Sequence, residues 1–195
     1  MPWEKAFNTD AALDQATRIF GKKGYDATSM SDLTEAMKIN KGSLYNAFGS
    51  KKELFDRALA RYDQQNRAAR LAELRGWNDP RAAIDALFQG LIDGARNDPA
   101  HLGCFVINTA QDLPNQSPEA AKLVRASLDQ IKEFFADMIV EGQKQAQISP
   151  SVDAEATAQG LLSLFVGMRV LSRGGVEVEV FDAIKASAMQ LLPAP

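Results

Sequence analysis

The chain has 195 residues, of which 46% are hydrophobic and 24% are charged, a balance typical of a globular protein with a buried core. Its single cysteine excludes a disulfide within the chain and fits a reducing compartment. The net charge of −3 does not indicate a nucleic-acid partner, but residues 1–61 carry ten Lys and Arg against eight Asp and Glu, whereas the remainder carries 12 against 17.

The first predicted helix covers residues 10–23, because apolar side chains recur there at helical spacing. Asn8 or Thr9 can cap its N-terminus. Gly24 is well placed to end it, since glycine readily adopts the left-handed backbone that follows many helices. The face that we expect to turn inward consists of Leu13, Ala16, Ile19 and Phe20.

Two short helices joined by a tight turn are predicted over residues 28–48. Thr28 and Ser29 are polar caps for the first of them, and residues 38–40 interrupt its apolar stripe. Asn40 can cap the second helix, residues 41–48. Together with the preceding helix they predict a small three-helix unit, whose expected core includes Leu13, Phe20, Leu33, Ile39, Leu44 and Phe48.

The helix over residues 41–48 leaves polar side chains on its free face, because Leu44 and Phe48 turn inward at i and i+4. A short exposed helix of this kind suits the major groove of DNA. Residues 50–53 then form the S-x-x-E pattern of a capping box, which predicts a further helix whose first amides, beside Lys51, form a natural phosphate site. The outward side chains are those of Lys41, Ser43, Tyr45 and Asn46.

Over about residues 10–60 this pattern resembles the TetR family of bacterial transcriptional repressors. The family pattern is roughly Ala-Gly-Val-Ser, x-Gly-Thr-Leu-Tyr, x-x-Phe and Ser-Lys, and residues 37–51 read MKIN, KGSLY, NAF and SK at the matching places. Lys38 stands where glycine is usual. We therefore expect base contacts from Lys41, Gly42, Ser43 and Asn46, and backbone contacts from Thr28, Ser29, Tyr45 and Lys51.

Helices are predicted along the rest of the chain, with no repeats and no alternation of strands and helices. Periodicity alone leaves residues 103–110 open between a short helix and a buried strand, and the helical surroundings favour the helix. Residues 176–180 alternate as a strand would, but we interpret them as the lead-in to the last helix. The predicted helices cover residues 51–74, 80–96, 103–110, 119–145, 153–172 and 181–192.

The helix over residues 153–172 is apolar nearly all round in its second half, so it must be buried on more than one face. The longest apolar run of the chain, residues 161–166, is far too short to span a membrane. The N-terminus lacks the apolar segment of a signal peptide. We therefore expect a cytoplasmic protein. The pattern leaves open a core helix of a monomer. The resemblance implies a homodimer through the last two helices, which would place two reading helices on palindromic double-stranded DNA.

The sequence contains no catalytic motif, so we expect no enzyme, cofactor or metal site. His101 and Cys104 alone cannot build a structural zinc site. The segment around Cys104 resembles one that lies against the ligand chamber in one branch of the family. Cys104 is therefore either a thiol that senses an electrophile or oxidant, a soft-metal ligand with His101, or a small buried hydrophobe.

The resemblance also implies a mostly apolar chamber for a small hydrophobic or amphipathic effector, although each candidate residue suits a plain core position equally well. Asn108 and Gln111 would be its polar handles. The candidates are Phe88, Ile92, Cys104, Phe105, Asn108, Phe134, Phe135, Phe165 and Met168.

We therefore expect an all-α protein with an N-terminal helix-turn-helix domain at residues 1–50, a linking helix at 51–74, and a ligand-binding and dimerisation domain over 51–195. The expected function is that of a dimeric repressor released from a palindromic operator by a small effector or a thiol-reactive signal. The alternative is an all-α module that senses or sequesters a small molecule without specific DNA binding.

Overall fold

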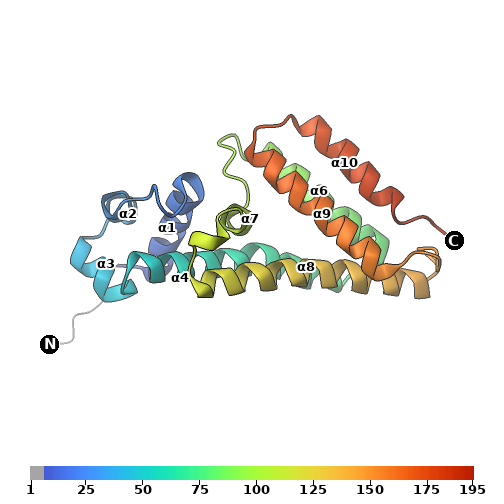
Figure 1. The fold of residues 1–195 in the computed structure, drawn as a ribbon, viewed down its shortest axis with the longest axis horizontal. Coiled ribbons are helices and arrows are strands. Elements are labelled where there is room, and N and C mark those ends of the chain that lie inside the picture. The colour runs from blue at the N-terminus through green and yellow to red at the C-terminus, as the bar shows by residue number, and fades with distance from the viewer. Residues whose placement is uncertain (1–6) are drawn as a thin grey trace.

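The structure, a computed structural model, describes residues 7–195, and within that range it contains helices and connecting turns but no strand (Figure 1). This confirms the all-α fold class. The helices are α1 (Thr9–Lys23), α2 (Met30–Met37), α3 (Lys41–Phe48), α4 (Lys51–Asp63), α5 (Ala69–Arg75), α6 (Pro80–Arg96), α7 (Phe105–Ala110), α8 (Pro118–Lys144), α9 (Ala154–Arg173) and α10 (Val178–Gln190).

The N-terminal unit, helices α1 to α3, lies at one end of an elongated molecule, and α6, α9 and α10 lie at the other (Figure 1). The long helix α8 runs beneath α7 and the helices of the other end, and α4 joins it to the N-terminal unit. Local capping explains where α1 begins and ends: the Asn8 side chain accepts from the amides of Asp10 and Ala11, and Gly24 ends the helix with φ of 78°.

The turn between α2 and α3 takes a left-handed residue, as a tight helix-turn-helix connection requires. Lys38 has φ of 54° and ψ of 41°, and its amide donates to the carbonyl oxygens of Thr34 and Glu35. A side chain at this angle costs more than glycine does. Lys38 nevertheless adopts the left-handed conformation at the position where the family pattern has glycine.

A capping box fixes the start of α2. The Ser29 hydroxyl accepts from the Asp32 amide, and the Asp32 carboxylate accepts in return from the Ser29 amide at 2.8 Å. Lys23, on α1, also donates to this carboxylate at 2.7 Å. The Lys23 ammonium and the Ser29 amide lower the pKa of Asp32 from 3.8 to about 2.

We expect Asp32→Asn to lower the midpoint of thermal unfolding at neutral pH. Because folding lowers the pKa of Asp32, its stabilising effect is present above the unfolded value of 3.8 and is lost as the pH falls through about 2. The gap in melting temperature between the variant and the parent should therefore narrow as the pH is lowered over this window. Asp129→Asn, on the exposed face of α8, is the control; a gap independent of pH would contradict the assignment.

The predicted helix over residues 51–74 is interrupted. Between α4 and α5 the chain forms a π-helical segment, η1 (Gln64–Ala68), in which the helix is locally widened by its longer hydrogen-bond spacing. The ends of the predicted helix are nearly right, since α5 reaches Arg75, but the prediction of one regular helix was wrong. Most residues of η1 are polar, so the spacing of apolar residues in the sequence did not indicate a π-helical segment.

Two apolar clusters make up the core. The first unites the N-terminal unit and α4 with α7 and the start of α8, through Phe105, Val106, Ala120 and Val124. Aromatic rings link its parts, with Phe105 5.2 Å from Phe55 between ring centroids. The second cluster joins α5, α6, α9, α10 and the rest of α8. Apolar packing is therefore continuous from the N-terminal unit across position 50 into α4, α7 and α8.

Some details of the sequence prediction needed correction. Leu13 and Ile39 are only partly buried at the edge of the first cluster, because Ala12 and Ala16 supply the closest face of α1. The last helix begins at Val178, three residues before the predicted start, so Val178 and Val180 lie in its first turn and Val176 precedes it. Residues 105–110 are helical, as predicted.

Candidate nucleic-acid interface and ligand cavity

Helix α3 presents a polar face because two large side chains hold its other face in the core. Leu44 and Phe48 are fully buried, and the Asn40 side chain caps the helix by accepting from the Ser43 amide at 2.8 Å. Tyr45 is 42% exposed. Lys41 lies over the ring of Tyr45, with its Nζ 5.9 Å from the ring centroid.

The three other predicted base-contact residues also lie on α3. Gly42 and Asn46 are exposed, and Ser43 is half-buried beneath the cap. A Cβ atom at Gly42 would lie 3.3 Å from the Asn40 oxygen that caps the helix. Glycine at position 42 therefore leaves the capping contact undisturbed while keeping the first turn of α3 free of a bulky side chain.

The predicted phosphate contacts are only partly presented at the surface. Ser29 is exposed, and Lys51 begins α4 with its Nζ 4.3 Å from the Tyr25 ring centroid. The Ser50 hydroxyl accepts from the Glu53 amide, which is one half of the predicted capping box. Thr28 requires a correction: its side chain is buried, and its hydroxyl donates to the Gly24 carbonyl at 2.6 Å, so it caps no helix and presents no donor.

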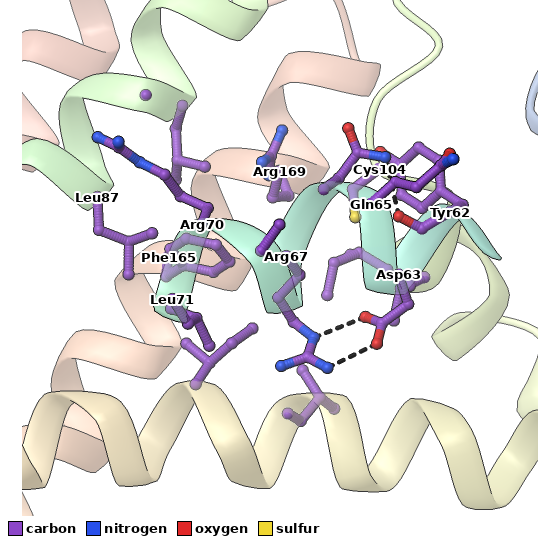
Figure 2. A pocket seen from close by; sticks show the side chains of 18 of the residues that line it. Tyr62, Asp63, Gln65, Arg67, Arg70, Leu71, Leu87, Cys104, Phe165 and Arg169 are labelled. Carbon is purple, nitrogen blue, oxygen red and sulfur yellow. Dashed lines mark hydrogen bonds and ion pairs between the residues drawn. The ribbon is translucent and has the colours of Figure 1, made fainter. Parts of the chain in front are cut away.

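A cavity of about 430 Å³ lies where η1 and its flanking turns face α6, α7, α8 and α9 (Figure 2). One wall is apolar, with Leu71, Leu87 and Phe165 among its residues. The opposite wall is polar and brings together Tyr62, Gln65 and Cys104. In Figure 2, Cys104 lies close to Tyr62 and Gln65, and Arg169 rises from α9 behind η1.

Most of the predicted effector-binding residues do not line this cavity. Cys104 and Phe165 do, whereas Phe105 and Asn108 line a smaller cavity of about 210 Å³ beside α1. The remaining predicted residues line neither of these two cavities and lie in the packed core, and an apolar helical stripe does not distinguish the two positions. These packed residues are Phe88, Ile92, Phe134, Phe135 and Met168.

Sequence reasoning missed the polar side of the larger cavity. Tyr62 lies within the predicted helix over residues 51–74, and no motif there indicates that it lines a cavity. The polar run from Gln64 to Arg67, in the middle of an otherwise amphipathic helix, was the signal that could have revealed it. Arg169 was overlooked because a single cation near the end of an apolar helix is common.

A buried ion pair anchors η1 against α8. The guanidinium of Arg67 donates twice to the Asp63 carboxylate, with both distances 2.6 Å, and both side chains are at least 86% buried. The Ser127 hydroxyl donates to the same carboxylate at 3.0 Å, and Arg67 also donates to Gln130. The dashed lines in Figure 2 mark the two bonds between Arg67 and Asp63.

The end of α9 is tied to the N-terminal unit. Arg173 donates from Nη1 to the Gly21 carbonyl of α1 at 3.2 Å and to the Leu102 carbonyl at 3.0 Å. Leu102 lies two residues before Cys104, which lines the larger cavity. One side chain therefore links α1 to the loop that enters the cavity wall.

Metal and membrane features are not found in the described range. Within residues 7–195 no cluster of three or more His, Cys, Asp and Glu side chains could hold a metal ion. His101 lies in the loop before α7 with φ of 49°. None of the helices described is both long and apolar enough to cross a bilayer.

An exposed, capped second helix of a helix-turn-helix, joined to a helical body with a cavity, defines a DNA-binding regulator. Two family models match the chain: "Bacterial regulatory proteins, tetR family" over residues 12–58, and "Tetracyclin repressor-like, C-terminal domain" over residues 80–179. The chain belongs to the TetR family and is a transcription regulator of that family.

Relatives with assigned roles support this membership. The HTH-type transcriptional repressor ComR of Escherichia coli K12 is 29% identical over 192 residues, which cover 97% of this chain and 90% of ComR. The Staphylococcus aureus regulator IcaR, a negative regulator of the biofilm operon icaADBC, is 30% identical, covering 67% of this chain and 77% of IcaR.

A solved structure of the TetR family regulator CifR, a cysteine mutant bound to 26-base-pair double-strand operator DNA, superposes with a TM-score of 0.82. It is 28% identical in sequence, and the match covers 96% of this chain and 98% of that chain. The likeness therefore extends over the N-terminal unit and the helical body together.

Proposed function

We propose that this regulator represses transcription in the cytoplasm as a homodimer on a palindromic operator, and that a small effector in the larger cavity, or a thiol-reactive signal at Cys104, releases it. The observation that carries the proposal is the polar, exposed face of α3, held outward by buried Leu44 and Phe48. The similarity to ComR, a repressor, and to CifR, a regulator solved on operator DNA, supports the same role.

Side-chain chemistry determines which residues contact the bases and which contact the phosphates in this proposal. Lys41 and Asn46 are exposed on α3 and suit hydrogen bonding to guanine and adenine edges, and Gly42 and Ser43 allow the first turn to approach the bases. Contacts with the phosphates come from Ser29, Tyr45 and Lys51, the last beside the free amides of the α4 N-terminus. In the free protein, the buried Thr28 supports this surface from behind.

Helices α9 and α10 provide the dimer interface in this proposal. Val170 on α9, Val180 on α10 and Leu191 directly after α10 are large apolar side chains that remain 41–42% exposed. A Cβ atom at Gly167 would meet nothing within 4 Å, so a partner helix could approach closely there. A second copy covers these surfaces, and two α3 helices then read two half-sites.

Release requires a path from the cavity to the N-terminal unit, and α4 provides one. Arg57 of α4 donates to the Ala47 carbonyl of α3, and Arg61 pairs with Asp14 of α1 at 2.9 Å, so α4 and the N-terminal unit move together. Because η1 continues α4 into the cavity wall, an effector that binds one arrangement of η1 more tightly shifts the spacing of the two α3 helices.

Cys104 supplies the second route for a signal. Its thiol is half-buried, lines the larger cavity and lies beside the Tyr62 hydroxyl. A covalent adduct at this sulfur would occupy the cavity as a bound effector does.

In this proposal residues 1–50 form the DNA-binding part of the chain, and residues 51–195 form the ligand-binding and dimerisation part.

Selection of bound duplexes from a random DNA pool tests the proposal, with Tyr45→Ala as the comparison. The wild type should enrich a palindrome and the variant should not, because its α3 has lost a phosphate contact and packing for Lys41. Tyr45→Phe keeps the ring and separates the two effects. Enrichment of a single half-site would contradict the dimer. If the wild type enriches nothing, a small-molecule sensing or sequestering module becomes the better description.

A further inference from the structure

The larger cavity contains an excess of positive charge. Five charged residues line it. Arg67 and Asp63 bind one another through two bonds of 2.6 Å, and Arg70 pairs with Glu73 at 2.7 Å. Among the described residues that line the cavity, Arg169 alone is charged and makes no ion pair. The cavity therefore carries a net charge of +1 from its side chains, located on α9.

One nitrogen of the Arg169 guanidinium also lacks a hydrogen-bond partner in residues 7–195. Its Nε atom is buried and unpartnered, and the group lies over the Phe165 ring with 5.7 Å between the Cζ atom and the ring centroid. A buried donor without an acceptor is costly, and a charged one more so. An occupant of the cavity that supplied an anionic acceptor would remove this cost.

The surroundings of Arg169 define the shape of such an occupant. Tyr62 lies nearby: burial first, and then Cys104, raise its pKa, while Arg169 lowers it. The net effect is an increase in the pKa, so the Tyr62 hydroxyl stays neutral and does not repel an anion beside Arg169. Leu71, Leu87 and Phe165 make part of the cavity wall apolar, and a volume of about 430 Å³ suits a molecule with a compact apolar body.

We propose that the effector is a small carboxylate with an apolar body, its carboxylate paired with Arg169 and its hydrocarbon part against Phe165, Leu87 and Leu71. A planar carboxylate matches the guanidinium fork in two parallel hydrogen bonds. A neutral molecule would leave Nε unsatisfied, and a cation would be repelled by the excess charge. This inference rests on the proposed function in one respect, since it identifies the class of the effector that releases DNA.

Binding of matched probes tests the proposal. Benzoate, phenylacetate, hexanoate and octanoate are each titrated calorimetrically beside the corresponding amide, which has nearly the same shape and no charge. At least one carboxylate should bind the wild type about tenfold or more tightly than its amide, as expected for a charged hydrogen bond. Arg169→Met should abolish that preference, and Arg169→Lys should restore part of it.

Control variants keep the result interpretable. Arg75→Met removes an arginine that pairs with Asp137 outside the cavity, and should leave carboxylate binding unchanged. Circular dichroism verifies that each variant is folded. Amides binding as well as carboxylates, unchanged carboxylate binding in Arg169→Met, or binding of no carboxylate at millimolar concentration would each overturn the inference.

The DNA experiment distinguishes this inference from the proposed function. A carboxylate that binds should release the selected duplex from the wild type and leave it bound to Arg169→Met. Binding of the palindrome without any carboxylate binding would overturn the inference alone. Carboxylate binding by a protein that enriches no DNA would leave the anion site standing and overturn the proposed function.

Discussion

Lys41→Ala should abolish specific binding to the operator while leaving the protein folded. A good side-chain contact with a base edge contributes about 1–3 kcal/mol of discrimination, and a dimer loses two of them, so specific affinity should fall by roughly 30-fold to 20,000-fold. Lys41 is exposed at the start of α3, and the core contacts of that helix come from other residues. Its removal should therefore leave the melting temperature nearly unchanged.

Lys144→Ala is the matched control for the loss of one positive charge, because Lys144 is exposed at the far end of α8. Electrophoretic mobility shifts on the selected palindrome and on a scrambled duplex provide the two affinities. Loss confined to the palindrome would support a base contact. An equal loss on both duplexes would instead assign Lys41 to the phosphate backbone and contradict the role proposed for it.

Asp63→Ala should be the most destabilising single substitution in the cavity wall. It would leave the Arg67 guanidinium, only 14% exposed, without its carboxylate partner, and it would also remove one of the two acceptors of the Ser127 hydroxyl. Removing one partner of a buried ion pair costs about 3 kcal/mol or more. The free energy of unfolding, measured in urea, should fall by that amount.

Two controls test the cause of this loss. Asp137→Ala breaks an exposed pair with Arg75, 3.6 Å apart, and should cost less than about 1 kcal/mol. The double variant Asp63→Leu with Arg67→Met replaces both charges by apolar side chains and should be more stable than Asp63→Ala. A double variant as unstable as the single one would show that packing, rather than the unpaired charge, determines the loss.

Local sequence signals predicted the N-terminal unit in detail. Asn40 and Ser50 are capping residues whose side chains act on amides three positions ahead, so their effect is visible in the sequence itself. The buried pair Leu44 and Phe48 is set by helical spacing in the same way. The face of α3 that projects outward follows from these local facts, and the family resemblance then attached a function to it.

The cavity could not be predicted in this way, because it depends on contacts between distant segments. Arg169 and Tyr62 are more than one hundred positions apart, and neither carries a motif. Whether Phe88 or Phe165 faces the empty space is determined by how α6 and α9 pack, which hydrophobic spacing does not encode. The prediction that Thr28 is exposed was wrong for a related reason, since its hydroxyl donates a hydrogen bond to the Gly24 carbonyl.

The π-helical turn at η1 also constrains how this chain tolerates changes in length. Such a turn accommodates one more residue than a regular helical turn would, and each residue of an α-helix corresponds to a rotation of about 100°. Loss of a single residue between positions 64 and 68 would thus turn α4, and the N-terminal unit attached to it, by roughly a quarter of a revolution relative to α5. The orientation of the DNA-binding surface in this protein is therefore set by residue count as well as by packing.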